Sequence, residues 1–328
     1  MNFQLGYKSY ADLSKDVFNA LGKIPDGVDL VVGVPRSGLM VATMIALNLN
    51  LRVCDVGSFL RNDSLKTGST RSASGGNLIN AHDATNILVV DDSIHTGLSL
   101  ATVKSQIHSS GYQGKVTYMA IYATAGSVKK VDIYGEIFPM PRLFQWNACH
   151  RKDLENFCFD IDGILCKSPT TEQSSNELAY ADFILNAPRF AIFTYKIGHL
   201  VTSRPEKYRT ETEIWLRRHS ITYGTLHMSD HVTEVERDTS EQAALFKAKV
   251  YASIPQAELF FESNHDQAVK IADVSGKPVL DFGNQILITP LMSMALLKKR
   301  GRTLADAASE MPSGLFRKLS KTVAKFFA

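Results

Sequence analysis

The stretch ILVVDDSIHTGLSL at residues 87–100 decides the fold prediction, because an apolar strand ends there in two acids and gives way at once to a helix. The same alternation continues on both sides of it. Strands are expected at residues 29–34, 86–92 and 115–123, with helices at about 37–50 and 98–109. Strands that alternate with helices predict a parallel sheet covered by the helices. We therefore predict an α/β fold.

A second series of strands and helices follows a proline-containing stretch, FPMPRLFQWNACHRKDLEN, at residues 138–156. A new strand is expected to begin at Phe157, and the alternation continues through GHLVTS, RTETEIWLRRHS, ELFFES and KPVLDF. A chain of 328 residues also exceeds the length at which one core usually keeps growing. We therefore predict two Rossmann-like parallel-sheet domains, at residues 1–150 and 151–290, and a tail at residues 291–328.

Composition and cysteine spacing place the protein in the cytoplasm. No charged and apolar leader opens the sequence, and no apolar run reaches the roughly 18 residues of a membrane span. Cys149, Cys158 and Cys166 lie near His150 but lack the paired spacing of a zinc site. We expect reduced thiols, as is usual in that compartment.

The tail differs in charge from the rest of the chain. Residues 297–328 hold eight Lys or Arg and two Asp or Glu, which gives them a net charge of +6. The whole chain carries +3, so the other residues together carry −3. Apolar and basic residues alternate there at helical spacing, which predicts a basic amphipathic helix. Such a helix can lie on the anionic inner face of a membrane. Alternatively it packs on a domain or on a second subunit of a homo-oligomer. The negative remainder argues against a nucleic-acid partner.

The segment after the first acid pair has the residues that a ribose phosphate needs. Ser93, Thr96 and Ser99 supply hydroxyl groups, Gly97 lets the backbone approach closely, and the following helix begins with free N–H groups that favour an anion. The carboxylates of Asp91 and Asp92 can accept hydrogen bonds from the two ribose hydroxyls. These residues predict a site for a ribose 5-phosphate.

This segment resembles the phosphoribosyl-diphosphate motif of the type I phosphoribosyltransferases, and the resemblance covers residues 1 to about 145. GVPRSGL at 33–39 resembles the pyrophosphate loop of that family, and DSLKTGSTRSASGGN at 63–77 resembles its mobile loop. The resemblance implies that phosphoribosyl diphosphate is a substrate. It implies these binding residues: Arg36, Ser37, Gly38, Lys66, Arg71, Asp91, Asp92, Ser93, Ile94, His95, Thr96, Gly97 and Ser99.

His95 departs from the purine-salvage members of the family, which have an aspartate for the base at this position. The departure argues against a nucleobase acceptor. The imidazole, with an ordinary pKa near 6.5, is a catalytic candidate that could deprotonate an acceptor hydroxyl; alternatively it only lines the loop. By analogy with the family, transfer inverts the α-linked donor and gives a β-linked ribofuranosyl 5-phosphate.

A second acid pair stands in CFDIDGILC at residues 158–166. Alternation along a strand points Asp160 and Asp162 the same way. Asp160 can attack phosphorus as a nucleophile, and Asp162 can protonate the leaving oxygen while both lie near one metal ion. The sequence therefore predicts a phosphatase site that is distinct from the ribose-phosphate site.

The segment resembles motif I of the haloacid dehalogenase superfamily, whose later motifs follow as far as residue 290. The resemblance implies that Thr202 binds the phosphoryl group and that Lys247, or failing it Lys249, neutralises charge. Magnesium fits the oxygen ligands. The implied metal ligands are Asp160, Asp162, Glu262 and Asp266, although Glu262 stands where the family most often has aspartate.

The spacing of these motifs predicts an open phosphatase site. Roughly forty residues separate Gly163 from Thr202, and a similar number separates Thr202 from Lys247, which leaves no room for an inserted cap domain. Uncapped members of the superfamily act on large substrates or use a neighbouring domain as a lid. The expected architecture is thus a type I phosphoribosyltransferase fold followed by an uncapped haloacid dehalogenase-like fold.

Together the two halves resemble the phosphoribosyltransferase and phosphatase pairs of bacterial surface-polysaccharide pathways. The resemblance implies transfer of 5-phosphoribosyl to a lipid-linked glycan, followed by removal of the 5-phosphate to leave β-ribofuranose. Three alternatives stay open: a nucleobase phosphoribosyltransferase with an attached nucleotidase, a nucleic-acid end phosphatase, and a non-catalytic phosphoribosyl-diphosphate sensor.

Overall fold

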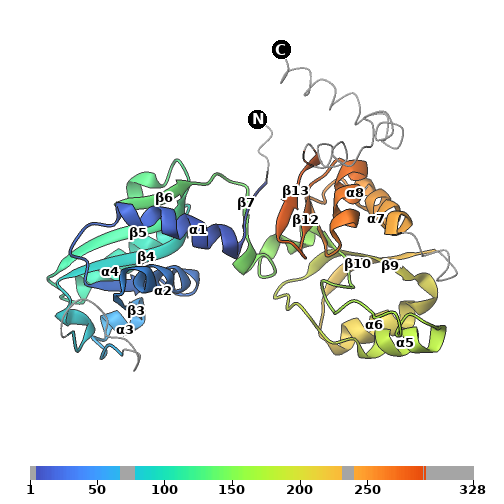
Figure 1. The fold of residues 1–328 in the computed structure, drawn as a ribbon, viewed down its shortest axis with the longest axis horizontal. Coiled ribbons are helices and arrows are strands. Elements are labelled where there is room, and N and C mark those ends of the chain that lie inside the picture. The colour runs from blue at the N-terminus through green and yellow to red at the C-terminus, as the bar shows by residue number, and fades with distance from the viewer. Residues whose placement is uncertain (1–4, 67–77, 231–239, 291, 293–328) are drawn as a thin grey trace, which may run out of the picture. The chain divides into compact units, whose positions relative to one another are not determined.

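The computed structural model describes residues 5–66, 78–230, 240–290 and 292 (Figure 1). Contacts divide the chain into two compact units, residues 1–146 and 147–328. Arg71, with most of the expected mobile loop, lies outside the described residues, and so does the predicted amphipathic helix of the tail. Within the described residues, no helix is both long enough and apolar enough to cross a membrane.

The first unit is built on a five-stranded parallel sheet with the order β3-β2-β4-β5-β6. The predicted parallel α/β fold is confirmed here, because each neighbouring pair of strands runs in the same direction. The strands are β2 (Leu30–Gly33), β3 (Arg52–Asp55), β4 (Asn86–Ile94), β5 (Lys115–Ala123) and β6 (Ile133–Ile137). The helices are α1 (Tyr10–Ala20), α2 (Ser37–Leu49), α3 (Val56–Leu60) and α4 (Leu98–Ser109).

Alternate residues of β4 pack against different helices, as the period of two requires. Leu88 and Val90 belong to a buried cluster that includes residues of α1 and α2. Ile87 and Val89 belong to a second cluster with residues of α3 and α4. The sheet of the first unit is therefore covered on both faces, and its loop after β4 lies at the carboxyl edge (Figure 1).

Two short strands form a separate sheet in the first unit. β1 (Gly6–Lys8) pairs in parallel with β7 (Arg142–Phe144), so that Gly6 lies beside Arg142. A turn of 3₁₀-helix, η4 (Gln145–Asn147), follows β7. The sequence predicted no element in this proline-containing stretch, because three residues are too few to show a period.

The second unit contains a six-stranded sheet with the order β10-β9-β8-β11-β12-β13, parallel except for its last strand. Its strands are β8 (Phe157–Phe159), β9 (Ile197–Pro205), β10 (Tyr223–Ser229), β11 (Leu259–Glu262), β12 (Val279–Asp281) and β13 (Ile286–Ile288). Its helices are α5 (Glu177–Asn186), α6 (Arg209–Arg218), α7 (Ser240–Ser253) and α8 (His265–Ser275).

The order of these strands positions the second acid pair. β9, β8 and β11 are neighbours, and Asp160 directly follows β8 while Glu262 ends β11. Thr202 lies within β9. Because parallel strands end at the same edge of a sheet, these side chains gather there. The four cysteines of the chain are free thiols.

Candidate functional sites

The loop after β4 brings the first acid pair next to the start of α2. An ideal Cβ on Gly38 would lie 2.7 Å from the carbonyl oxygen of Val90 and 2.9 Å from Oδ1 of Asp91. Only a glycine permits this approach. The structure therefore places the predicted pyrophosphate loop directly beside Asp91, although the two segments lie far apart in sequence.

Asp92 is held by two neutral donors. The hydroxyl of Ser37 donates a hydrogen bond to Oδ1 at 2.8 Å, and the indole Nε1 of Trp146 donates to Oδ2 at 2.8 Å. The side chain of Asp92 is buried. The sequence did not predict a role for Trp146, which stands in the stretch where the strand and helix pattern lapses.

Asp91 has a different environment from its neighbour. Its Oδ1 accepts a hydrogen bond from the backbone N–H of Asp92 at 2.9 Å. Burial, together with the charge of Asp92, raises the pKa of Asp91 to about 8. A carboxyl with this pKa is largely protonated at neutral pH, so Asp91 can donate a hydrogen bond as well as accept one.

The rest of the loop is arranged for an incoming group. Gly97 adopts a left-handed conformation, with φ of 76°, and α4 begins directly after it. His95, Thr96 and Ser99 are exposed, Ser93 is half-buried, and Ile94 is buried. Lys130 donates a hydrogen bond to the carbonyl oxygen of Thr96. The exposed hydroxyls therefore stand at the start of a helix, where backbone N–H groups favour a phosphate.

Two cavities of the first unit are lined by other residues of the predicted binding loops. Arg36 is exposed in the pyrophosphate loop. Ser99 lines a cavity of about 490 Å³ together with Pro35, so the two loops share a wall. Lys66 lines another cavity of about 560 Å³ with Asp55 and Asp63, away from the acid pair itself.

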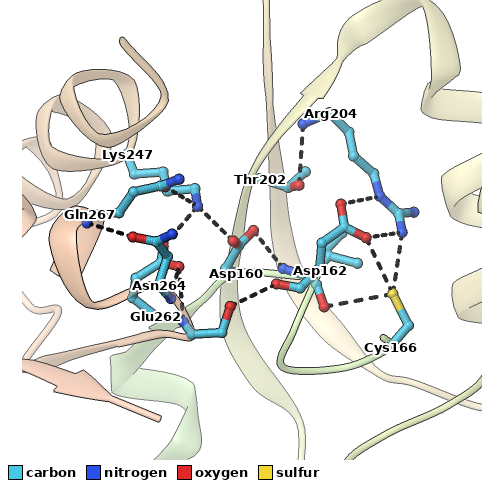
Figure 2. A network of polar contacts seen from close by, with 11 residues as sticks. Asp160, Asp162, Cys166, Thr202, Arg204, Lys247, Glu262, Asn264 and Gln267 are labelled. Atoms are coloured by element: carbon cyan, nitrogen blue, oxygen red, sulfur yellow. Dashed lines mark hydrogen bonds and ion pairs between the residues drawn. The ribbon is translucent and has the colours of Figure 1, made fainter. Parts of the chain in front are cut away.

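Lys247 is the centre of the second site (Figure 2). Its Nζ donates hydrogen bonds to Oδ2 of Asp160 at 2.6 Å, to Oε2 of Glu262 at 2.7 Å and to Oε1 of Gln267 at 2.9 Å. Lys247 and Glu262 are each 1% exposed. Burial lowers the pKa of Lys247, but the two carboxylates outweigh it and raise that pKa. Lys249, the alternative in the sequence, is exposed on the same helix.

Asp160 is the buried carboxylate nearest to Lys247. Its Oδ1 accepts a hydrogen bond from the backbone N–H of Ile161 at 2.7 Å. Burial raises the pKa of Asp160 to about 7, against the lowering by the charge of Lys247. This carboxyl therefore changes its charge close to neutral pH.

Asp162 faces a second buried cation (Figure 2). Arg204 donates from Nε to Oδ2 at 3.0 Å and from Nη2 to Oδ1 at 2.7 Å, and its side chain is fully buried. Nη2 also lies 3.3 Å from Sγ of Cys166. The backbone N–H of Arg204 donates to Oγ1 of Thr202 at 3.3 Å. The sequence did not single out Arg204, although it follows Thr202 by two positions in TSRPEKYR.

Two of the predicted magnesium ligands, Asp162 and Glu262, make hydrogen bonds with other groups of the protein. Oε1 of Glu262 accepts from the backbone N–H groups of Ser263 and Asn264, each at 2.9 Å, and its other oxygen accepts from Lys247. Both oxygens of Asp162 are held by Arg204. In the described part of the chain, no group of three or more His, Cys, Asp or Glu side chains is arranged to hold a metal. The magnesium set of Asp160, Asp162, Glu262 and Asp266 therefore stays a prediction.

Comparisons with known proteins bear on the first unit. Residues 3–141 match the family model of the phosphoribosyl transferase domain. No curated protein matches the chain.

Solved structures of three phosphoribosyltransferases are similar to part of the chain. The xanthine-guanine-hypoxanthine enzyme of Helicobacter pylori is 20% identical, covers 44% of this chain and 92% of its own, and has a TM-score of 0.34. The purine enzyme of Pyrococcus horikoshii is 20% identical, and the match covers 44% of this chain and 94% of that enzyme, with a TM-score of 0.31. The orotate enzyme of Aeropyrum pernix is 21% identical, and the match covers 38% of this chain and 67% of that enzyme, with a TM-score of 0.26. On the family model, this chain contains a phosphoribosyl transferase domain, at residues 3–141.

Proposed function

We propose that this protein is a bifunctional enzyme that transfers 5-phosphoribosyl from phosphoribosyl diphosphate to a glycan and then removes the 5-phosphate. One observation carries the proposal. A phosphoribosyl transferase domain is followed on the same chain by a unit in which Asp160, Lys247 and Glu262 meet at the carboxyl edge of a parallel sheet. The proposed domains are the transferase, the phosphatase and the basic tail.

The transfer step uses the first acid pair. In the proposal, the ribose hydroxyls bind Asp91 and Asp92, while the 5-phosphate binds the hydroxyls and N–H groups of residues 93–99. Arg36 to Gly38 bind the diphosphate, together with Lys66 and Arg71. The bond from ribose C1 to the diphosphate oxygen breaks, and a bond to the acceptor oxygen forms. His95, which is exposed beside the phosphate loop, takes the acceptor proton.

The phosphatase step uses the second acid pair. Asp160 attacks the phosphorus, and the sugar oxygen leaves with a proton from Asp162. Water then attacks the phosphorus of the aspartyl intermediate and gives a proton back to Asp162, so that the bond to Asp160 breaks and phosphate is released. Lys247 supplies positive charge beside the nucleophile, at 2.6 Å. Thr202 binds the phosphoryl oxygens. Magnesium, which phosphoribosyltransferases typically use, would enter the first unit with the diphosphate and neutralise part of its charge.

The acceptor is proposed to be a lipid-linked glycan. His95 stands where purine-salvage members have a base-handling aspartate, which argues for a hydroxyl acceptor. The basic tail, outside the described residues, would hold a cytoplasmic enzyme against the inner membrane face, or else pack on a second subunit.

Mass spectrometry of the acceptor tests the proposal. The full chain is incubated with phosphoribosyl diphosphate, magnesium and either lipid-linked glycans or nucleobases, and pyrophosphate and phosphate are followed. A glycan should gain ribose with wild-type protein and ribose phosphate with Asp160→Asn. Glu172→Gln, at an exposed acid of the same unit, should behave as wild type. Transfer to a nucleobase alone would contradict the glycan proposal, and binding without turnover would favour a sensor.

A further inference from the structure

The ribose-binding acid Asp92 keeps unused acceptor capacity. Ser37 and Trp146 each donate one hydrogen bond, to different oxygens of the carboxylate. A carboxylate oxygen has two lone pairs, so a second acceptor position remains on each. With 5% of its surface exposed, Asp92 has little freedom to turn away from these donors. Two neutral donors therefore set the direction in which its free lone pairs point.

The segment at residues 142–146 contacts the end of strand β4 at two positions. Arg142 donates from Nη2 to the carbonyl oxygen of Ile94 at 3.2 Å and from Nη1 to that of Phe138 at 2.9 Å. Four residues later, Trp146 reaches Asp92. Burial lowers the pKa of Arg142, and the charge of Asp92 acts in the opposite direction. The contacts at positions 92 and 94 thus come from one short segment.

The indole of Trp146 is itself fixed by ring packing. It stacks on Phe144, with centroids 4.7 Å apart and planes at 16°. Phe144 in turn stacks on Tyr122 at 5.2 Å. The hydroxyl of Tyr122 donates to Asp16 at 2.8 Å, which anchors the stack to α1. Stacked rings with few rotatable bonds hold the Nε1–H at a set position.

We propose that Trp146 is a positioning residue of the phosphoribosyl-diphosphate site, which aims Asp92 at the ribose hydroxyls and senses whether they are bound. This inference rests on the proposed function of the first unit. A neutral N–H leaves the carboxylate its charge, so Asp92 stays a strong acceptor for uncharged hydroxyls. When the ribose binds, the same oxygen serves both the indole and the sugar, and the environment of the indole changes.

Tryptophan emission combined with calorimetry tests the inference. The chain has two tryptophans, and Trp215, which is fully buried in α6, donates to the carbonyl oxygen of Ala187 in the second unit. In a Trp215→Phe background, magnesium and phosphoribosyl diphosphate should shift the emission of Trp146, with the same midpoint as the calorimetric titration. If that background is unstable, the difference between wild type and Trp146→Phe gives the same signal.

Affinity gives the second measurement. Trp146→Phe keeps a ring on Phe144 but removes the N–H, and should weaken phosphoribosyl-diphosphate binding about tenfold in calorimetry. Tyr10→Phe, in a ring 5.8 Å from that of Trp146, is the matched control and should bind as wild type. If phosphoribosyl diphosphate binds but changes no tryptophan emission, and if Trp146→Phe binds it as tightly as wild type, the role of Trp146 is overturned while the proposed function stands. No heat of binding for wild type would instead overturn the proposed function.

Discussion

The two acid pairs of this chain are held in opposite ways. In the first unit, the hydrogen bonds to Asp91 and Asp92 described above come from neutral donors, Ser37, Trp146 and the backbone, and Arg142 acts on Asp92 only through its charge. In the second unit, each acid faces a buried cation. Lys247 lies 2.6 Å from Asp160, and Arg204 holds both oxygens of Asp162.

The difference indicates what each site is prepared to bind. Burial and the neighbouring charge of Asp92 raise the pKa of Asp91 to about 8, so this carboxyl is largely protonated at neutral pH. In the second unit, Lys247 and Arg204 offset most of the negative charge of three buried or half-buried carboxylates, which in the proposed function lets an anionic phosphoryl group approach. The comparison predicts that removing a buried cation from the second site changes the free energy of unfolding more than removing a carboxyl charge from the first site.

Lys247→Met should have the largest effect. It leaves Asp160 and Glu262 without a counter-charge in a buried site, which costs about 3–5 kcal/mol of unfolding free energy. Urea unfolding of the second unit, followed by Trp215 emission, measures this loss, and phosphate release should disappear with it. Lys249→Met, at an exposed position of α7, is the matched control and should change neither. Equal stability of both variants would show that Lys247 is not the counter-charge.

Arg204→Lys should have the next largest effect. Lysine keeps the charge but cannot make the paired contact with Asp162, so about 2 kcal/mol of unfolding free energy should be lost. The same urea transition measures it. Arg217→Lys, at an exposed position of α6, should be indistinguishable from wild type. Retention of full stability by Arg204→Lys would mean that charge alone matters there.

The pH dependence of phosphate release tests the state of Asp160. Only the ionised carboxylate attacks phosphorus, and burial raises its pKa to about 7. The rate should therefore rise about tenfold per pH unit below 7 and level off above it. Stopped assays of phosphate between pH 5 and pH 9 measure this profile, which Glu172→Gln should leave in place. A rate that is flat across this range would contradict the shift.

Asp91→Asn should have the smallest effect. A raised pKa in the folded state means that wild-type stability falls as the pH rises from near 4 to about 8. Asparagine removes this fall, so the variant should gain about 1 kcal/mol over wild type for each pH unit between pH 6 and pH 8. Trp146 emission during urea unfolding reports on this unit, with Asp26→Asn as an exposed control. A stability difference between Asp91→Asn and wild type that shrinks as the pH rises would contradict this prediction.

The helices and strands that follow the βα pattern of the first unit were predictable, whereas its three-residue strands were not. The strand expected at 115–123 and the helix expected at 98–109 coincide with β5 and α4. β7 has three residues and carries no periodic signal, so the position of Trp146 depends on its pairing with β1. Such a pairing between distant segments cannot be read from local pattern.

The second site shows the same limit. The sequence favoured Lys247 and kept Lys249 as the alternative, and burial distinguishes them, because Lys247 is buried and Lys249 is exposed on α7. Arg204 turns to Asp162 because β8 and β9 are neighbours in the sheet. The sequence therefore predicts which residue types take part, whereas strand order decides which of them meet.

The pairing of β1 with β7 has a further consequence. Gly6 lies beside Arg142, so the first and last strands of the transferase unit are neighbours. A unit whose ends meet tolerates circular permutation, because a short linker can join the old ends while new ones open elsewhere. Gly111, exposed between α4 and β5, is such an opening. The unit is thus a module that could be moved within a longer chain without changing the order of its sheet.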